Sequence, residues 1–186
     1  MIGYAFCGSF CTLSHSLAAL RRLVAEGYDV LPIFSEKVSS TDSRFWQAKE
    51  FTQTVEAMCG RTAIRTIVDA EPLGPTTPLD ALVISPCTGN TLAKLASGIT
   101  DSAVTMAAKA HLRCDRPLLL ALASNDSLSA NLSNIAKLLQ RKGVFFVPMR
   151  QDDPAKKPHS LVADFTCLYD SLGAAMDGRQ LRPLFL

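Results

Sequence analysis

The chain has 186 residues, which fits a single domain spanning residues 1–186 with a full hydrophobic core. Its 19 basic and 17 acidic residues leave a net charge of +2, and this balance excludes nucleic acid and anionic membranes as expected partners. Apolar residues make up 48% of the chain, but no apolar run approaches the roughly 20 residues that a membrane-spanning helix needs.

Strand-like and helix-like patterns alternate along the chain, which is typical of parallel β-α-β units. The elements expected in the first half are a strand at 2–7, a helix at 13–26, a strand at 29–34, a helix at 43–58, a short strand within 61–68 and a proline-containing connector at 71–80. The helix at 13–26 carries Leu13, Leu17, Leu20 and Val24 on one stripe.

The second half continues this alternation. The expected elements are a strand at 81–84, helices at 91–97 and 103–112, a strand at 117–123, a helix at 128–141, a strand at 144–147, a charged loop at 148–158 and a final helix at 161–176. The run LLLALA within 117–123 is apolar on both faces, as in a central parallel strand. The sequence therefore predicts a doubly wound, Rossmann-like or flavodoxin-like three-layer sandwich around a central parallel sheet of five or six strands.

Clusters of small polar residues follow four of the predicted strands, at 8–12, 35–41, 85–91 and 123–131. In doubly wound sheets, ligands bind outside the carboxyl ends of the strands, so these clusters predict one shared site. Loops are polar in general, and each cluster alone is equally consistent with ordinary turns.

Two of these clusters stand directly between a strand and a helix. Ser85-Pro86 is followed by Thr88, Gly89, Asn90 and Thr91, and the first strand is followed by Gly8, Ser9 and Thr12. Helix N-termini carry unpaired N–H groups and partial positive charge, so such junctions suit an anion or the polar edge of a ring. The alternative interpretation of Ser9, Thr12, Asn90 and Thr91 is that they are turn or N-cap residues.

The absence of the common dinucleotide-binding and P-loop motifs narrows the type of ligand that the chain is expected to bind. Gly8-Ser9 does not belong to a GxGxxG motif, no acidic residue ends the second strand, and no Gly-Lys-Ser/Thr sequence is present. What remains is a single phosphate held by hydroxyls and backbone N–H groups, for which Ser9, Thr12 and Ser35 are the candidates. A mononucleotide such as FMN fits this set better than NAD or ATP.

Cysteines and histidines show no ligand pattern. The six cysteines lack paired spacing and no basic segment precedes the first strand, so we expect reduced thiols in a cytoplasmic protein. The three histidines are scattered, and no metal site is expected. Cys87 is interpreted as a packing residue, because no adjacent base or cation is evident.

Three segments carry a family resemblance: GSFCT after the first strand, SPCTGNTLAKLASGITDSAV in the middle and ALASNDSLSANLSNIAKLL later. They resemble the homo-oligomeric flavin-containing cysteine decarboxylase (flavoprotein) superfamily. Its Pro-Ala-Thr-x-Asn-Thr motif corresponds to Pro86–Thr91 and its Pro-x-Met-Asn motif to Ala123–Asn125. Within this superfamily, the chain resembles the dipicolinate synthase B-subunit family of spore-forming bacteria over nearly its whole length. The loop FVPMRQDDPAKKPHSL resembles that family specifically.

This resemblance implies an oxidoreductase subunit that oxidises a dihydrodipicolinate-type pyridine dicarboxylate precursor to dipicolinic acid. It implies FMN on this chain, an A subunit that binds NAD(P), a homo-oligomer, and a location in the cytoplasm of the mother cell. By this resemblance, Ser9 and Ser35 would face the FMN phosphate. The flavin or ribityl chain would be faced by Thr88, Asn90 and Thr91. Ser124 and Asn125 would lie over or beside the flavin ring. The full predicted cofactor-binding set is Gly8, Ser9, Thr12, Ser35, Pro86, Thr88, Asn90, Thr91, Ser124 and Asn125.

Departures from the superfamily leave alternatives open. Residues 36–79 contain no histidine, no cysteine follows Asn125 before Cys167, and Phe10 and Cys11 stand where small residues are usual. The missing histidine and cysteine disfavour an FMN-dependent decarboxylase, whereas Phe10 and Cys11 argue against tight binding of a flavin phosphate. The decarboxylase stays an alternative together with a prenyltransferase and a non-catalytic ligand-binding or activating subunit. No catalytic residue is predicted. In the charged loop, Arg150 and Lys157 are a hypothetical dicarboxylate pair, against the interpretation of a solvated or partner-binding loop.

Overall fold

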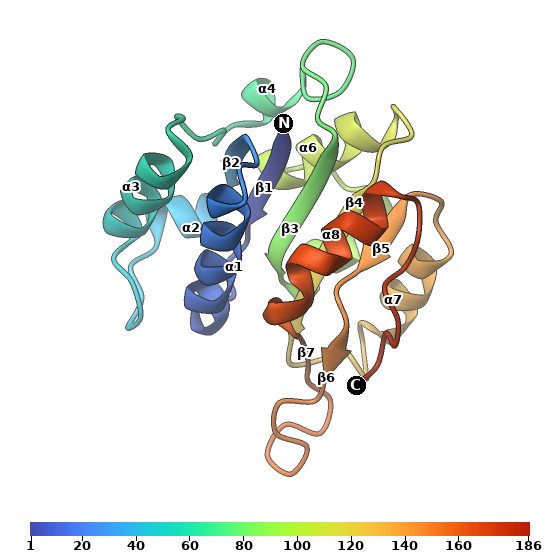
Figure 1. Cartoon of the computed structure of the whole chain (residues 1–186). Coiled ribbons are helices and arrows are strands. Elements are labelled where there is room, and N and C mark those ends of the chain that lie inside the picture. Colours follow the sequence, from blue (N-terminus) through green and yellow to red (C-terminus); the bar gives the residue numbers. More distant parts are fainter.

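The computed structural model describes all 186 residues and contains one seven-stranded sheet in the order β2-β1-β3-β4-β7-β6, with β5 paired to β4 (Figure 1). The strands are β1 (Ile2–Phe6), β2 (Val30–Phe34), β3 (Ala81–Cys87), β4 (Leu118–Ser124), β5 (Val144–Phe146), β6 (Met149–Arg150) and β7 (Leu161–Ala163). The pairs from β1 to β5 are parallel, whereas β6 and β7 are antiparallel additions. The predicted doubly wound fold is confirmed, and the sheet is mixed.

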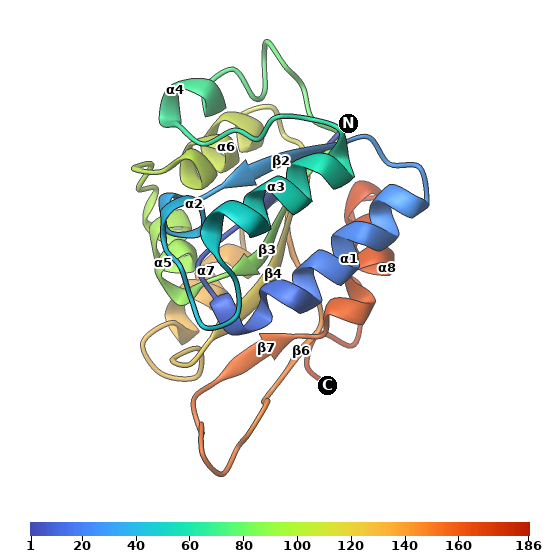
Figure 2. The same cartoon turned by 90° about the vertical axis from the view of Figure 1, so that its left-hand side faces the viewer.

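Helices cover both faces of this sheet (Figures 1 and 2). The helices are α1 (Leu13–Ala25), α2 (Glu36–Ser40), α3 (Ala48–Cys59), α4 (Ile67–Ala70), α5 (Gly89–Ser97), α6 (Ala103–Leu112), α7 (Leu132–Leu139) and α8 (Leu168–Met176). Buried residues of α1, α3 and α8 belong to one hydrophobic cluster, and those of α4 to α7 belong to another. The fold therefore has three layers, with the sheet in the middle and one layer of helices on each of its faces.

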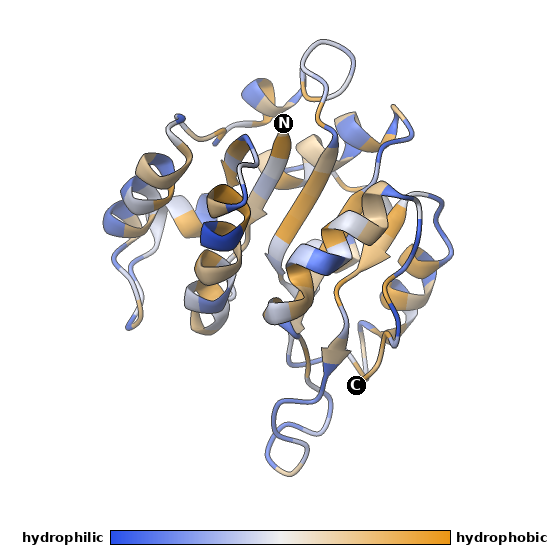
Figure 3. Cartoon of the chain, in the orientation of Figure 1, coloured by the Kyte–Doolittle hydropathy of each residue, from blue (hydrophilic) through white to orange (hydrophobic).

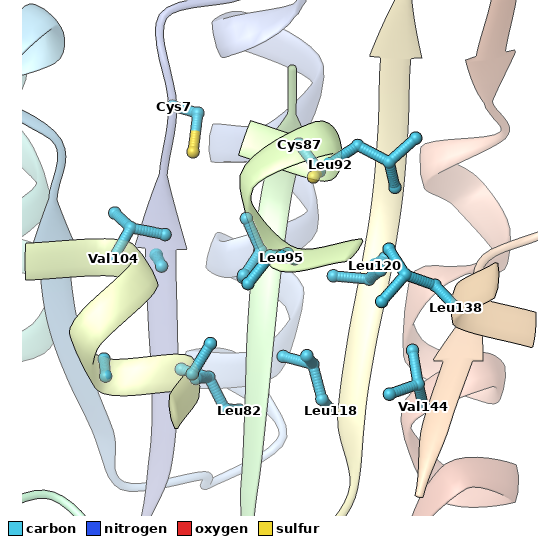
Figure 4. Packing of buried hydrophobic residues seen from close by; sticks show 14 of the residues in the cluster. Cys7, Leu82, Cys87, Leu92, Leu95, Val104, Leu118, Leu120, Leu138 and Val144 are labelled. Carbon is cyan, nitrogen blue, oxygen red and sulfur yellow. The ribbon is translucent and has the colours of Figure 1, made fainter. Parts of the chain in front are cut away.

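The two-residue period of the strands builds both clusters. In β1, Tyr4 and Phe6 point into the cluster under α1, whereas Ala5 and Cys7 at its end point into the cluster on the opposite face. The apolar strands and polar outer surfaces are visible in Figure 3. Figure 4 shows the second face, where Leu95 of α5 and Leu138 of α7 pack over Leu120 of β4.

Differences from the predicted elements lie mainly after residue 147. The segment predicted to begin the last helix forms β7 and a 3-10 helix, η2 (Phe165–Cys167), and α8 begins only at Leu168. Leu161–Ala163 is extended because it pairs with Ala123 and Ser124 on one side and with β6 on the other. Asp164 then caps η2 by accepting the N–H of Thr166 at 3.1 Å.

Smaller differences have local causes. The predicted strand within 61–68 is reduced to one bridge between Ile33 and Ile64. The helix expected at 43–58 begins at Ala48, whose N–H donates to the Asp42 carboxylate at 2.9 Å. The helix expected from residue 128 begins at Leu132, because residues 125–131 form turns.

The strand order 2-1-3-4-5 places a topological switch point between β1 and β3, where the chain connections leave in opposite directions along the sheet. The carboxyl ends of these strands lie at the lower edge of the sheet in Figure 1, together with the β6–β7 hairpin. Ligands of such sheets bind at this edge. None of the helices combines the length and apolar character that crossing a membrane requires.

Candidate functional site at the carboxyl edge of the sheet

The loops that follow β1, β2 and β3 are joined by backbone hydrogen bonds at the carboxyl edge. The N–H of Ser35 donates to the carbonyl oxygen of Phe6 at 3.0 Å, and the N–H of Cys7 donates to the carbonyl oxygen of Pro86 at 3.3 Å. The predicted polar clusters that follow these three neighbouring strands therefore begin side by side at the carboxyl edge of the sheet. This common edge is the geometric core of the candidate site.

The loop after β1 leads through a 3-10 helix, η1 (Phe10–Thr12), into α1. The Thr12 hydroxyl donates to the carbonyl oxygen of Ser9 and to Ser9 Oγ, both at 3.0 Å, and Thr12 is buried. A Cβ at Gly8 would lie 3.3 Å from Lys37 Cβ, so glycine allows α2 to pack closely on this loop. Ser9 stays half-buried, with its hydroxyl fixed by Thr12.

Ser35 follows β2 and is the N-cap residue of α2. Its Oγ is buried and has no hydrogen-bond partner, and it does not cap the helix. A buried hydroxyl without a partner costs about 1–3 kcal/mol, so an oxygen acceptor at this place would be stabilising. This orphaned hydroxyl, beside the loop after β1, fits a phosphate group.

The residues after β3 divide into inward and outward groups. Thr88 Oγ1 accepts the N–H of Thr91 at 3.2 Å and caps α5, while the Thr91 hydroxyl donates to Cys7 Sγ at 3.3 Å. Pro86 is buried within β3. Asn90 is exposed, and its amide makes no hydrogen bond within the protein. Of this group, Asn90 presents a free donor and a free acceptor at the carboxyl edge.

The loop after β4 is organised by Asp126, which the sequence patterns did not single out. Its carboxylate accepts the Ser124 hydroxyl at 2.5 Å and the Asn131 amide at 2.9 Å, and the hydrogen bond from Ser124, followed by that from Asn131, lowers the pKa of Asp126. A Cβ at Gly89 would lie 2.4 Å from Ser124 Oγ, so glycine lets α5 dock on this loop. Asn125 remains exposed beside it.

The loop sequence SNDSLSAN contained a local signal for this role of Asp126. Aspartate side chains commonly bond to nearby backbone or side-chain donors in turns, and here the Asp126 carboxylate accepts from Ser124 and Asn131. The Ser124 hydroxyl is therefore already committed to Asp126, whereas Asn125 is free.

The thiols near the edge are inert packing groups. Cys7 and Cys87 are buried, and burial raises the pKa of Cys7 to about 11 and that of Cys87 well above its ordinary value. A thiol in this state is a poor nucleophile. The interpretation of Cys87 as a packing residue is therefore confirmed. No group of three or more His, Cys, Asp or Glu side chains is arranged to hold a metal ion.

We expect alkylation to separate these thiols. In the native protein, iodoacetamide should modify the exposed Cys11 first and leave Cys7 and Cys87 unmodified on the same timescale. Peptide mass spectrometry at several times measures the rates, and the denatured protein is the control in which all three thiols react. Modification of native Cys87 as fast as Cys11 would contradict the packing role.

The charged loop closes the β6–β7 hairpin below the sheet in Figure 1. Arg150 forms an ion pair with Asp164, and Lys157 forms one with Asp152. Arg150 and Lys157, the hypothetical dicarboxylate pair, are thus each engaged by a carboxylate of the hairpin region. A cavity of about 660 Å3 lies between this hairpin and α1.

A protein family and known relatives match most or all of this chain. The family model described as Flavoprotein matches residues 2–177. The B subunit of dipicolinate synthase from Bacillus subtilis (strain 168) is 43% identical over 185 residues, covering 100% of this chain and 92% of that protein. Flavin prenyltransferase UbiX from Chlamydia muridarum is 25% identical over 137 residues, covering 72% of this chain and 71% of that protein.

Solved structures give the same relationship. The crystal structure of the B subunit of dipicolinate synthase from Bacillus halodurans C matches with a TM-score of 0.91 and 38% identity, covering 100% of this chain and 95% of that chain. The FMN-dependent cysteine decarboxylase SpaF matches with a TM-score of 0.69 and 22% identity, covering 94% of this chain and 95% of that chain. The second match shows a shared fold.

Proposed function

The chain belongs to the flavoprotein family, and on this premise we propose that it is the B subunit of a dipicolinate synthase, oxidising a dihydrodipicolinate-type precursor to dipicolinic acid together with an A subunit that binds NAD(P). The observation that carries the proposal is the 43% identity along the whole chain to the B subunit of a dipicolinate synthase. The TM-score of 0.91 to a second such protein supports it.

The proposed cofactor of this chain is FMN, bound at the carboxyl edge. The buried and unpartnered Ser35 Oγ, close to the loop that carries Gly8 and Ser9, supports a phosphate position there. The free amides of Asn90 and Asn125 would hold the polar edge of the ring. The chemistry that FMN supplies when bound is acceptance of a hydride from the substrate ring.

The remaining predicted residues have supporting roles in this proposal. Thr12, Pro86, Thr88 and Thr91 shape the loops after β1 and β3, because their polar groups are engaged or their side chains are buried. Ser124 positions the loop after β4 through Asp126. These residues orient the cofactor-binding loops, whereas Ser35 and the two asparagines contact the cofactor.

A second candidate is a ligand-binding or activating subunit without chemistry of its own. One observation favours it: the Phe10 ring lies 3.7 Å from the place of a Gly8 Cβ, so a bulky side chain borders the proposed phosphate position. A decarboxylase is disfavoured because residues 36–79 lack a histidine and no cysteine lies between Asn125 and Cys167. The prenyltransferase alternative is supported by a relative that is 25% identical over 72% of this chain.

Assembly and location complete the proposal. We place the protein in the cytoplasm of the mother cell of a spore-forming bacterium, as a symmetric homo-oligomer that also binds the A subunit. Exposed apolar side chains such as Val68 and Ile99, which are 76% and 48% exposed, are consistent with contacts between copies.

Co-expression with the A subunit tests this function. Dipicolinate, measured by chromatography of cell extracts, should form when both subunits are present and stay at background when either is expressed alone. The visible absorption of the purified chain decides between the two candidates, because a flavin band supports the FMN enzyme and a colourless, FMN-insensitive protein supports the activating subunit. Dipicolinate formation by the A subunit alone would overturn both candidates.

A further inference from the structure

The cavity of about 660 Å3 is separate from the proposed FMN position. Its walls are the outer face of α1, the strands β6 and β7, and the start of α8, and none of the ten predicted cofactor-binding residues lines it. The volume lies in the range of small-molecule sites.

One stripe of α1 faces this cavity. His15, Ala18, Ala19 and Arg22 have the i, i+3, i+4, i+7 spacing of one helical face, and all four line the cavity. The leucines of α1 that are buried in the core lie on the other side of the helix. The two alanines leave room between the helix and the hairpin, so the cavity is open between the imidazole and the guanidinium.

The lining charges leave Arg22 without a partner. Arg150 is neutralised by Asp164, and Asp152 is neutralised by Lys157. No carboxylate lies within ion-pair distance of Arg22, whose guanidinium carbon is instead 4.4 Å from the centre of the Tyr169 ring. This cation–π contact holds the guanidinium against tyrosine while its N–H groups stay available. The cavity therefore contains one uncompensated cation.

Aromatic surface completes the lining. Phe165 lines the cavity and is buried, and the His15 ring meets it edge-on with 6.0 Å between ring centres. Tyr28 contacts Tyr169 in a T-shaped arrangement, with 6.2 Å between ring centres. A flat ring can pack against these groups, and a carboxylate on that ring can accept two parallel hydrogen bonds from Arg22.

We propose that this cavity binds a planar aromatic carboxylate, with one carboxylate on Arg22 and the ring beside Phe165 and Tyr169. The identity of the acid rests on the proposed function, which makes it the pyridine dicarboxylate that the enzyme forms; because the cavity is separate from the proposed FMN position, this molecule is bound away from the place of hydride transfer. The site itself rests on the stripe of α1 and on the guanidinium held against Tyr169, and it does not depend on FMN.

Titration calorimetry with pyridine-2,6-dicarboxylate tests the site on the full chain. Arg22→Gln should weaken binding by about tenfold or more, because hydrogen bonds to a charged group are lost. Arg21→Gln is the matched control: it removes the same charge from the adjacent, exposed position that does not line the cavity, and the affinity should stay within about twofold. Equal effects of the two substitutions would overturn the site.

A second variant fills the cavity without touching its charge. Ala18→Leu, at an exposed position of α1, should reduce binding by about tenfold while leaving thermal unfolding nearly unchanged. Undiminished binding to this variant, or no binding to the unaltered protein, would overturn the proposal. Inorganic phosphate should not compete; competition at similar concentration would identify a general anion site and overturn the aromatic ligand.

The proposal that FMN binds at the carboxyl edge can be tested independently of the cavity. Ser35→Ala should leave the affinity for pyridine-2,6-dicarboxylate unchanged, since Ser35 does not line the cavity. Binding that depends on Arg22 in a protein that takes up no FMN would support the cavity and count against the flavin enzyme. Binding that is lost with Ser35→Ala would overturn the separation of the two sites.

Discussion

Replacing Phe6 by alanine should lower the free energy of unfolding by about 3–5 kcal/mol, the usual range for a buried phenylalanine. Phe6 is 0% exposed and ends β1, between its neighbours β2 and β3. Its ring centre lies 5.0 Å from that of Tyr4, 5.7 Å from that of Phe34 and 5.2 Å from that of Phe51. The substitution removes one member from each of these three aromatic contacts and leaves a cavity under α1 and α3.

Urea denaturation followed by circular dichroism measures this loss. Phe45→Ala is the matched control, because it deletes the same side chain at a position that is 44% exposed, and we expect a loss below about 1 kcal/mol there. Similar losses for the two variants would contradict the assignment of Phe6 to the core. Because the Phe6 carbonyl oxygen accepts the N–H of Ser35, loosening of β1 is also expected to disturb the candidate site.

The parallel core of the fold could be predicted because its signals are local. The run Leu118–Leu122 is apolar on both faces, and its side chains are divided between the two clusters of the core. The leucine stripe of α1 predicted the helix to within one residue of its observed end. Such patterns report burial directly, so they need no knowledge of the partner segment.

The hairpin could not be predicted because its signal is not local. Leu161–Ala163 is strand only by pairing with β4 and β6, and the residues themselves are compatible with the predicted helix. Asp164 explains the boundary, since it caps η2 directly after the strand. Short strands of two or three residues depend on tertiary contacts, which periodicity along one segment does not contain.

The sequence predicted that the polar loops meet at the carboxyl edge of the sheet, but it did not predict the directions of their side chains. The hydroxyls of Thr12 and Thr91 point to Ser9 and Cys7 within the protein, a choice that the sequence left open between capping and binding. The cavity beside α1 was not predicted, because Arg22 and Tyr169 are brought together only by the packing of α1 against α8. No motif in the sequence links positions so far apart.

Ser35→Ala should raise the dissociation constant for FMN by about 10- to 100-fold, the loss expected for one hydrogen bond to a charged phosphate. The same substitution should not lower the free energy of unfolding and should raise it by up to about 1–3 kcal/mol, because it removes a buried hydroxyl that has no partner in the protein. Loss of affinity without loss of stability is the signature that separates a ligand contact from a structural hydroxyl. Quenching of FMN fluorescence measures the affinity, and urea denaturation measures the stability.

Ser40→Ala is the matched control for this substitution, since it removes a hydroxyl from the same short helix. Ser40 Oγ donates to the carbonyl oxygen of Glu36 at 2.8 Å on the exposed side of α2, so its loss should leave FMN binding unchanged. If FMN binds to the Ser35→Ala variant as tightly as to the unaltered protein, the placement of its phosphate at the end of β2 is contradicted. Failure of the unaltered protein to bind FMN would also count against the site, and the orphaned hydroxyl would then need another acceptor.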